Sequence, residues 1–265
     1  MLPHRNFARV AAHLLFLSAS FLVGMMGIGT LAGCGGPRGD EGLLVSVAAN
    51  LQPAMMELGD VYRAQTGHEV TFNFASSGKL AQQIHEGAPV DMFISADAHY
   101  VNELIDAGLI QPQEHHSIAR GRLVIWTTGP EAFTLKDLAQ PEIARIAMAN
   151  PDHAPYGRAA QEALMAADLW KAVHPKLVYG ENVFQAFQFA ESRDADAALA
   201  SLSQAILSTG TWTLVPENLH SPLEQTAAIL SRSQHRAQAQ QFLEFLTGAK
   251  AQAILERYGY EVIGP

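Results

Sequence analysis

The chain has 265 residues, 48% of them apolar and 16% charged, with a formal net charge of −9. This apolar content excludes disorder as the main state, and the length suffices for one large α/β domain or two lobes of about 100 residues each. The negative charge, without a basic run interleaved with aromatic residues, argues against nucleic acid as a partner. A single cysteine, Cys34, excludes an internal disulfide and a thiolate zinc site.

The N-terminal segment has the pattern of a bacterial export signal. Two arginines precede an uncharged run from Leu14 to Gly33, and the letters LAGC that end at Cys34 resemble a bacterial lipobox. We therefore expect residues 1–33 to be a signal peptide, Cys34 to be lipidated, and residues 34–42 to include a short tether. The globular part then lies outside the cytoplasm, held to a membrane by the lipid. The alternative is an uncleaved transmembrane anchor, because an uncharged run of this length can span a bilayer.

After Cys34, short apolar runs alternate with helix-length segments. This alternation predicts parallel βαβ units and a doubly wound sheet. A polar stretch before Leu123 divides the pattern into two series, which predicts two lobes with a cleft between them: residues 43–120 with 224–265, and residues 121–223. The expected strands are 43–48, 69–74, 90–95, 123–127, 143–149, 176–179, 197–202 and 225–230; the expected helices are 51–65, 79–86, 97–106 (capped by Asp97), 156–169, 183–191 and 235–246, with an amphipathic segment at 251–258.

Four turns that follow predicted strands are candidates for ligand binding. In open α/β sheets, ligands bind beyond the carboxyl ends of the strands, where turns lead into helices. The turns at 48–50, 74–79, 150–157 and 180–183 are rich in small and neutral polar residues. Helix N-termini carry unpaired N–H groups and a partial positive charge, which suits an anion. Any single turn is also explained by helix capping alone, because Ser, Asn and Asp are favoured at helix starts.

No sequence pattern typical of an enzyme is present. The chain has no GxSxG, HExxH or Walker motif, and no GxGxxG after a strand. A secreted hydrolase using Ser76 or Ser77 would need a base that the sequence does not reveal. We therefore expect neither catalysis nor a cofactor. Three further polar pairs lack a third metal ligand and are interpreted as caps or surface residues: Asp91 with Asp97, His115 with His116, and Asp152 with His153.

Taken together, the segments VAANLQPAM, TFNFASSGKLAQQI, GAPVDMFISAD, ANPDHAPYGRAAQEAL and ENVFQAFQF, in this order, resemble the molybdate-binding component of ATP-driven importers. The resemblance extends from Leu43 to Tyr260. It implies the two-lobed periplasmic-binding-protein fold of type II, each lobe a doubly wound sheet, with the ligand in the cleft. It also implies a monomeric solute-binding protein for molybdate or tungstate, whose partners are a membrane permease and its ATPase subunit.

The resemblance also implies which residues bind the oxyanion. Asn50 follows the first strand, and Ser77 is the second serine of the ASS turn, expected to donate through its hydroxyl and backbone. Tyr156 and Val183 match positions that donate backbone N–H groups from the second lobe. Ala49 stands where one branch of the family has threonine, so its contact is limited to the backbone. Molybdenum or tungsten would be bound by these residues only as the oxyanion.

Some family members contribute a tyrosine hydroxyl from the strand where this chain has Ser201, and we do not expect that contact here. Molybdate and tungstate are fully deprotonated at neutral pH, so neutral donors suffice to bind them. Sulfate has the same charge and would be rejected only by cavity size. The alternatives are therefore the same fold binding sulfate or another tetrahedral oxyanion, a ferric-iron-binding protein, for which Tyr156 and Tyr179 are too few tyrosines, or the secreted hydrolase.

Overall fold

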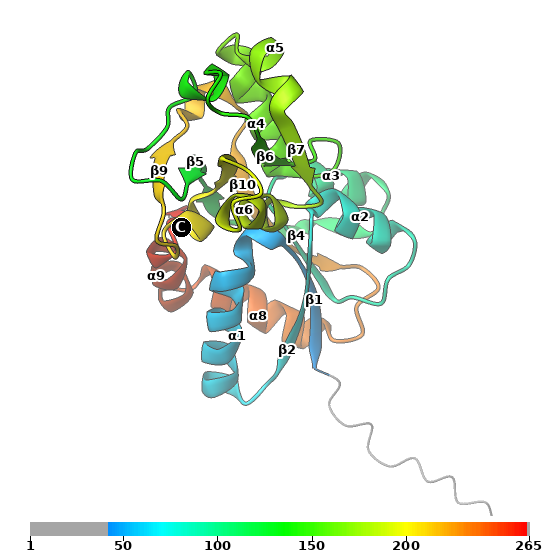
Figure 1. The fold of residues 1–265 in the computed structure, drawn as a ribbon. Coiled ribbons are helices and arrows are strands. Elements are labelled where there is room, and N and C mark those ends of the chain that lie inside the picture. The colour runs from blue at the N-terminus through cyan, green and yellow to red at the C-terminus, as the bar shows by residue number, and fades with distance from the viewer. Residues whose placement is uncertain (1–41, 264–265) are drawn as a thin grey trace, which may run out of the picture. The chain divides into compact units, whose positions relative to one another are not determined.

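The computed structural model describes residues 42–263 (Figure 1). The predicted signal peptide and lipidated Cys34 lie outside the described residues, as does the predicted tether apart from residue 42. Within residues 42–263, no helix has the length and apolar character needed to cross a membrane.

The first sheet has six strands in the order β11-β4-β10-β3-β1-β2. β1 is parallel to β2 and β3, as the predicted βαβ pattern requires, whereas β10 is antiparallel to β3 and β4, and β11 is antiparallel to β4. The strands are β1 (Leu43–Ala48), β2 (Val70–Ala75), β3 (Met92–Ser95), β4 (Ile110–Gly121), β10 (Leu223–Leu230) and β11 (Glu261–Val262).

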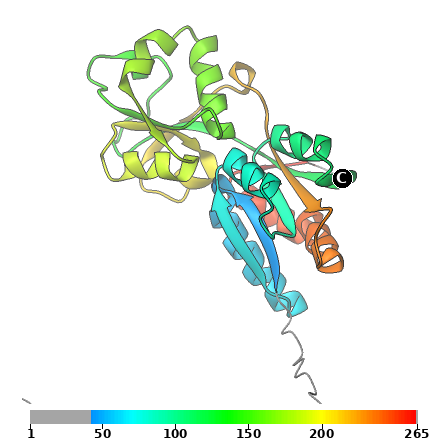
Figure 2. The same ribbon diagram turned by 90° about the vertical axis from the view of Figure 1, so that its right-hand side faces the viewer.

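The second sheet has five strands in the order β7-β6-β8-β5-β9. Its parallel part is β6 with β7 and β8, and β5 runs antiparallel to β8 and β9. Figure 2 shows the two sheets in separate parts of the fold. The strands are β5 (Leu123–Thr127), β6 (Ile146–Ala149), β7 (Leu177–Gly180), β8 (Ala197–Ser201) and β9 (Thr211–Leu214).

Helices cover both faces of each sheet. α1 begins with Pro53 in its first turn and ends at Gly67, whose φ of 77° only glycine adopts readily. The helices are α1 (Gln52–Thr66), α2 (Ser77–His85), α3 (His99–Asp106), α4 (Pro155–Ala166), α5 (Trp170–Val173), α6 (Val183–Glu191), α7 (Leu202–Ala205), α8 (Arg236–Thr247) and α9 (Ala249–Arg257), with 3-10 turns η1 (Ala49–Leu51), η2 (Asp137–Ala139), η3 (His174–Lys176) and η4 (Glu217–Leu219).

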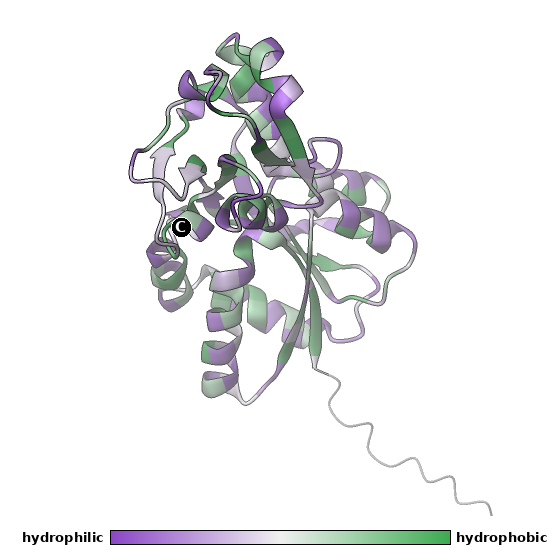
Figure 3. Cartoon of the chain, in the orientation of Figure 1, coloured by the Kyte–Doolittle hydropathy of each residue, from purple (hydrophilic) through white to green (hydrophobic). Residues whose placement is uncertain are grey.

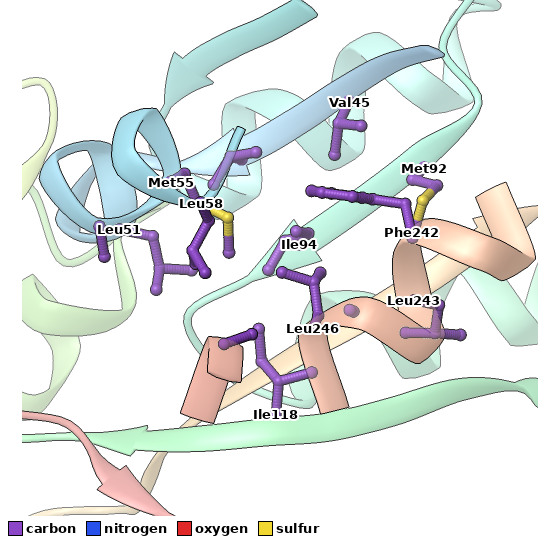
Figure 4. Packing of buried hydrophobic residues seen from close by; sticks show 14 of the residues in the cluster. Val45, Leu51, Met55, Leu58, Met92, Ile94, Ile118, Phe242, Leu243 and Leu246 are labelled. Carbon is purple, nitrogen blue, oxygen red and sulfur yellow. The ribbon is translucent and has the colours of Figure 1, made fainter. Parts of the chain in front are cut away.

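The buried hydrophobic clusters explain why helices cover both faces of the first sheet. β1 alternates its side chains, so Val45 packs with α1 and α8 on one face, whereas Leu44 packs with α2 and α3 on the other. Figure 3 shows β1 as mostly hydrophobic and α1 as alternately hydrophilic and hydrophobic. In Figure 4, Leu58 of α1 and Phe242 of α8 lie over this sheet. Burial of one such side chain stabilises the fold by about 1.5–3 kcal/mol. The predicted α/β architecture of two doubly wound sheets is confirmed.

Below, lobe 1 denotes the six-stranded sheet with α1–α3, α8 and α9, and lobe 2 denotes the five-stranded sheet with α4–α7. The lobe limits at residues 120/121 and 223/224 remain a prediction. β4 and β10 pair with each other in the first sheet, and their ends at Gly121 and Leu223 adjoin the elements of the second.

Two local expectations were wrong. The polar stretch before Leu123 is the long strand β4, paired with β10 on one side and β11 on the other. The middle of β4 is polar and partly exposed, so this segment lacks the apolar pattern by which a strand is predicted. α3 starts after Ala98, one residue later than expected, and Asp97 Oδ1 accepts a hydrogen bond from Tyr100 N–H in its first turn at 3.5 Å. The other carboxylate oxygen of Asp97 pairs with Arg158 of α4, a contact that only the tertiary structure creates.

Candidate anion-binding site

The strand registers bring the four predicted turns together in pairs. Ala48 at the end of β1 is the partner of Ala75 at the end of β2, so the turns that follow them are neighbours. In lobe 2, Ala149 of β6 is the partner of Gly180 of β7, with the same result. Because the carboxyl ends of parallel strands share one edge of a sheet, each lobe presents two turns at one edge.

These turns enclose one small cavity of about 10 Å³. Such a volume suits a compact ligand and excludes an organic solute of ordinary size. All five predicted binding residues line this cavity, although binding by each of them remains a prediction. The lining residues are Ala48, Ala49, Asn50, Ser76, Ser77, Ala96, Ala154, Pro155, Tyr156, Asn182 and Val183.

Three helices begin at the cavity. Ser77 and Val183 are the first residues of α2 and α6, and Tyr156 is the second residue of α4. N–H groups in a first helical turn have no partner within the helix, and each helix N-terminus carries a partial positive charge. The cavity is therefore surrounded by backbone donors from both lobes.

The hydroxyl of Ser77 is placed to donate a hydrogen bond. Ser77 is fully buried, and its Oγ accepts a hydrogen bond from the backbone N–H of Ala96 at 3.0 Å. A hydroxyl has one proton and can accept and donate together. Because the Ser77 oxygen accepts from Ala96 N–H, the Ser77 O–H is left to donate a hydrogen bond to a ligand.

Asn50 uses its side chain differently. Its Nδ2 donates to Gln225 Oε1 at 2.7 Å and to Tyr260 Oη at 3.0 Å. An amide group has only two such protons, so the donor that Asn50 offers to a ligand is its backbone N–H. The ring of Tyr156 is also buried, and burial raises the pKa of its hydroxyl well above the ordinary value, which keeps the phenol protonated.

None of the described residues that line the cavity carries a formal charge. An anion held here is balanced by hydrogen bonds and helix dipoles rather than by an ion pair. The lining also offers no carboxylate to accept a proton from a protonated anion. Elsewhere in residues 42–263, no group of three or more His, Cys, Asp or Glu side chains is arranged to hold a metal ion.

His153 of lobe 2 contacts lobe 1 at the edge of the cavity. Its Nδ1 lies 2.8 Å from Ser76 Oγ, and its carbonyl accepts a hydrogen bond from Gly78 N–H at 2.9 Å. Burial and the nearby Lys79 ammonium lower the pKa of His153, which keeps the imidazole neutral at neutral pH. A Cβ at Gly78 would lie 2.7 Å from the same carbonyl, so glycine permits this approach of the lobes.

Two ion pairs also join the lobes. Arg158 of α4 lies 2.6 Å from Asp97, and Lys79 of α2 pairs with Glu181 after β7. The guanidinium of Arg158 also stacks over the ring of Tyr100. Together with the contacts of His153, these ion pairs join the two lobes beside the cavity.

We expect Arg158→Gln to accelerate ligand release measurably, by up to about 5-fold. A partly exposed ion pair contributes about 0–1 kcal/mol, so closure is weakened but not abolished. Stopped-flow measurement of dissociation tests this, with Arg145→Gln as the control, since Arg145 is an exposed arginine of lobe 2. Equal dissociation rates for the two variants would contradict a role of Arg158 in closure.

Gly157, the glycine of the APYG sequence, stands where a larger residue would clash. A Cβ at Gly157 would overlap the carbonyl oxygen of Ala149, a backbone atom at the end of β6. We expect Gly157→Ala to strain the start of α4 by about 1–3 kcal/mol, offset by about 1 kcal/mol of helix propensity. Chemical unfolding and anion titration measure the loss. Gly129→Ala is the control, because a Cβ there meets only Thr127 Oγ1 at 3.6 Å; an equal effect of both changes would exclude the steric explanation.

The two-lobed fold with a small cavity between the lobes is that of a solute-binding protein. The family model of bacterial extracellular solute-binding proteins matches residues 43–261, and the chain belongs to this family. Its relatives include the molybdate-binding protein ModA of Rhodobacter capsulatus, 34% identical over 221 residues, 82% of this chain and 87% of the relative.

A second relative, the molybdate-binding protein ModA of Azotobacter vinelandii, is 33% identical over 252 residues, 92% of this chain and 98% of the relative. The solved structure of the periplasmic molybdate-binding protein of Azotobacter vinelandii superposes with a TM-score of 0.79 at 31% identity. It covers 83% of this chain and 99% of that structure. These matches confirm the predicted resemblance.

Several residues around the cavity escaped sequence reasoning. Ser76 and Asn182 line the cavity, although the sequence indicated them only as ordinary residues at helix starts. Asn182 does cap α6, because its side chain accepts a hydrogen bond from Gln185 N–H at 3.0 Å. Gln225 and Tyr260 hold Asn50 from across the fold. Because they are far from Asn50 in sequence, no local pattern indicated them.

Proposed function

We propose that this protein captures molybdate or tungstate outside the cytoplasm and delivers it to an ATP-driven importer. The observation that carries the proposal is the convergence of three helix N-termini on a small cavity lined by uncharged residues. A fully deprotonated oxyanion needs donors and no acceptor, which is what this lining offers. The names of the relatives, which bind molybdate, support the same ligand class.

In this proposal the ligand is held from both lobes. Ser77 donates through its hydroxyl and backbone, and Ala49 and Asn50 donate through the backbone of lobe 1. Tyr156 and Val183 donate their N–H groups from lobe 2. Closure by hinge motion brings the two donor sets together and forms the contacts of His153 with lobe 1. No group acts as a nucleophile or transfers a proton, and no cofactor takes part.

The partners follow from the same proposal. A membrane permease recognises the closed, ligand-bound form, and its ATPase subunit supplies the energy for transport. A lipid on Cys34 keeps the monomeric protein at the membrane surface, outside the cytoplasm.

Calorimetric titration of residues 35–265 with molybdate, tungstate, sulfate and phosphate tests this function. We expect one-to-one binding of the first two anions and binding of sulfate about 1,000-fold weaker, a difference of about 4 kcal/mol. Because sulfate has the same charge, the difference measures cavity size. Sulfate binding as tight as molybdate binding would assign the site to another tetrahedral oxyanion. No heat with any of the four anions would contradict the proposed site.

A further inference from the structure

A buried polar cluster lies directly behind the cavity and holds Asn50 at both its side chain and its main chain. The Asn50 amide donates to Gln225 and Tyr260, and the Tyr260 hydroxyl in turn donates to the carbonyl oxygen of Asn50 at 2.8 Å. Asn50 is 1% exposed, Gln225 0% and Tyr260 3%. A buried hydrogen bond cannot be exchanged for one to water, so these contacts restrain Asn50 strongly.

The cluster joins three parts of the fold. Tyr260 precedes β11, and Gln225 lies on β10. Ser203 of α7 in lobe 2 donates to the same Asn50 carbonyl at 2.9 Å, and its Oγ lies 3.2 Å from the Tyr260 hydroxyl. Gln225 is fixed in turn, because its Nε2 donates to the carbonyl of Leu223 at 2.7 Å. The Asn50 carbonyl therefore accepts one hydrogen bond from each lobe.

This arrangement decides which donor Asn50 presents to the cavity. The side chain and the carbonyl of Asn50 are both held by hydrogen bonds. The carbonyl of Ala49, which shares a peptide group with the Asn50 N–H, accepts a hydrogen bond from Gln52 N–H. The direction of its N–H is then fixed as well, before any ligand arrives. Donors that are already oriented bind an anion without the cost of ordering them.

We propose that Tyr260 is a positioning residue of the anion site, whose hydroxyl, together with Gln225 and Ser203, orients the backbone donor of Asn50. The proposal rests on the function proposed above. Tyr260 itself does not line the cavity. It acts on the ligand through Asn50, and burial raises the pKa of Tyr260, so its hydroxyl remains a donor across the physiological pH range.

The test compares Tyr260→Phe with Tyr62→Phe in the full-length protein, purified from bacterial envelopes in detergent and titrated with sodium molybdate. Tyr62 is an equally buried tyrosine of lobe 1, whose hydroxyl donates to Gln241 Oε1 at 3.1 Å, and it does not line the cavity. Both changes remove one hydroxyl from a buried tyrosine. We expect the dissociation constant to rise about 3- to 10-fold for Tyr260→Phe, and less than about 2-fold for Tyr62→Phe.

A double-mutant cycle with Asn50→Ala separates positioning from a general loss of stability. If Tyr260 acts through Asn50, the losses of affinity caused by the two changes are not additive, because Asn50→Ala removes the amide that bonds Tyr260 and keeps the carbonyl that Tyr260 also bonds. Additive losses, or equal affinities of Tyr260→Phe and Tyr62→Phe, would overturn the proposal while leaving the proposed function intact. If the wild-type protein binds no oxyanion, the proposed function itself fails, and the positioning role fails with it.

Should Tyr260→Phe not fold, Ser203→Ala provides the same test, because it removes the other hydrogen bond to the Asn50 carbonyl. Its control is Ser208→Ala, which removes a hydroxyl bonded at 2.8 Å to the carbonyl of Ala205 in the same lobe. We expect a weaker affinity for Ser203→Ala alone. Equal affinities of these two variants would contradict the proposal.

Discussion

Replacement of Val183 with proline is expected to lower the affinity for molybdate about 10- to 100-fold while the fold is retained. The change removes the backbone N–H of Val183, and a hydrogen bond to a charged acceptor contributes about 1.5–3 kcal/mol. Val183 is the first residue of α6, a position where proline is favoured, since its N–H has no helical partner. Asn182 before it is extended, with φ −154° and ψ 175°, as a residue before proline requires.

The matched control for this change is Val183→Ala. Alanine retains the N–H and loses methyl groups that pack in the core of lobe 2, so it lowers stability without removing the donor. Calorimetric titration of both variants, with thermal unfolding of each, separates the two effects. If the proline and alanine variants bind molybdate equally well, Val183 does not donate to the anion.

Ser77→Ala is expected to weaken molybdate binding by about 1–3 kcal/mol, the cost of leaving a charged acceptor short of one donor. The same change removes the acceptor of the buried Ala96 N–H, so the protein without ligand should also unfold at a lower temperature. Titration calorimetry measures the first effect and thermal unfolding without ligand measures the second.

Ser95→Ala is the control for Ser77→Ala. Ser95 is an equally buried serine at the end of β3, one residue before Ala96, and it does not line the cavity. Its hydroxyl bonds Asp97, the partner of Arg158, so its loss should lower stability and weaken binding far less than Ser77→Ala does. Unchanged affinity in Ser77→Ala would remove Ser77 from the site, and the hydroxyl would then serve only to hold Ala96.

Segments with a strong pattern of their own were predicted well. β1 and α6 have the predicted limits, because each is an uninterrupted run with turn or capping residues at its ends. β4, β9 and β11 were missed. β4 is stabilised by pairing on both edges rather than by an apolar pattern, and β11 has only two residues. The sequence of one segment alone does not indicate that it pairs with a distant strand.

The candidate site shows the same division. The four turns were found in the sequence because each follows a strand and opens a helix, and the five candidate residues were carried over from a family resemblance. That these residues line one cavity follows from the strand registers and from the packing of the lobes. The contact of His153 with Ser76 and the pairing of Arg158 with Asp97 had no counterpart in any local pattern.

The sequence by itself determined the order of most strands and helices and the small polar turns that follow the strands, because periodicity and helix-start chemistry are local properties. The resemblance of five of its segments indicated the family. Only the tertiary structure decided how the donors are used. It assigns the Asn50 amide to Gln225 and Tyr260, and the acceptor side of Ser77 to Ala96. The physical reason is that a buried polar group must find a partner, and which partner it finds depends on what the fold places beside it.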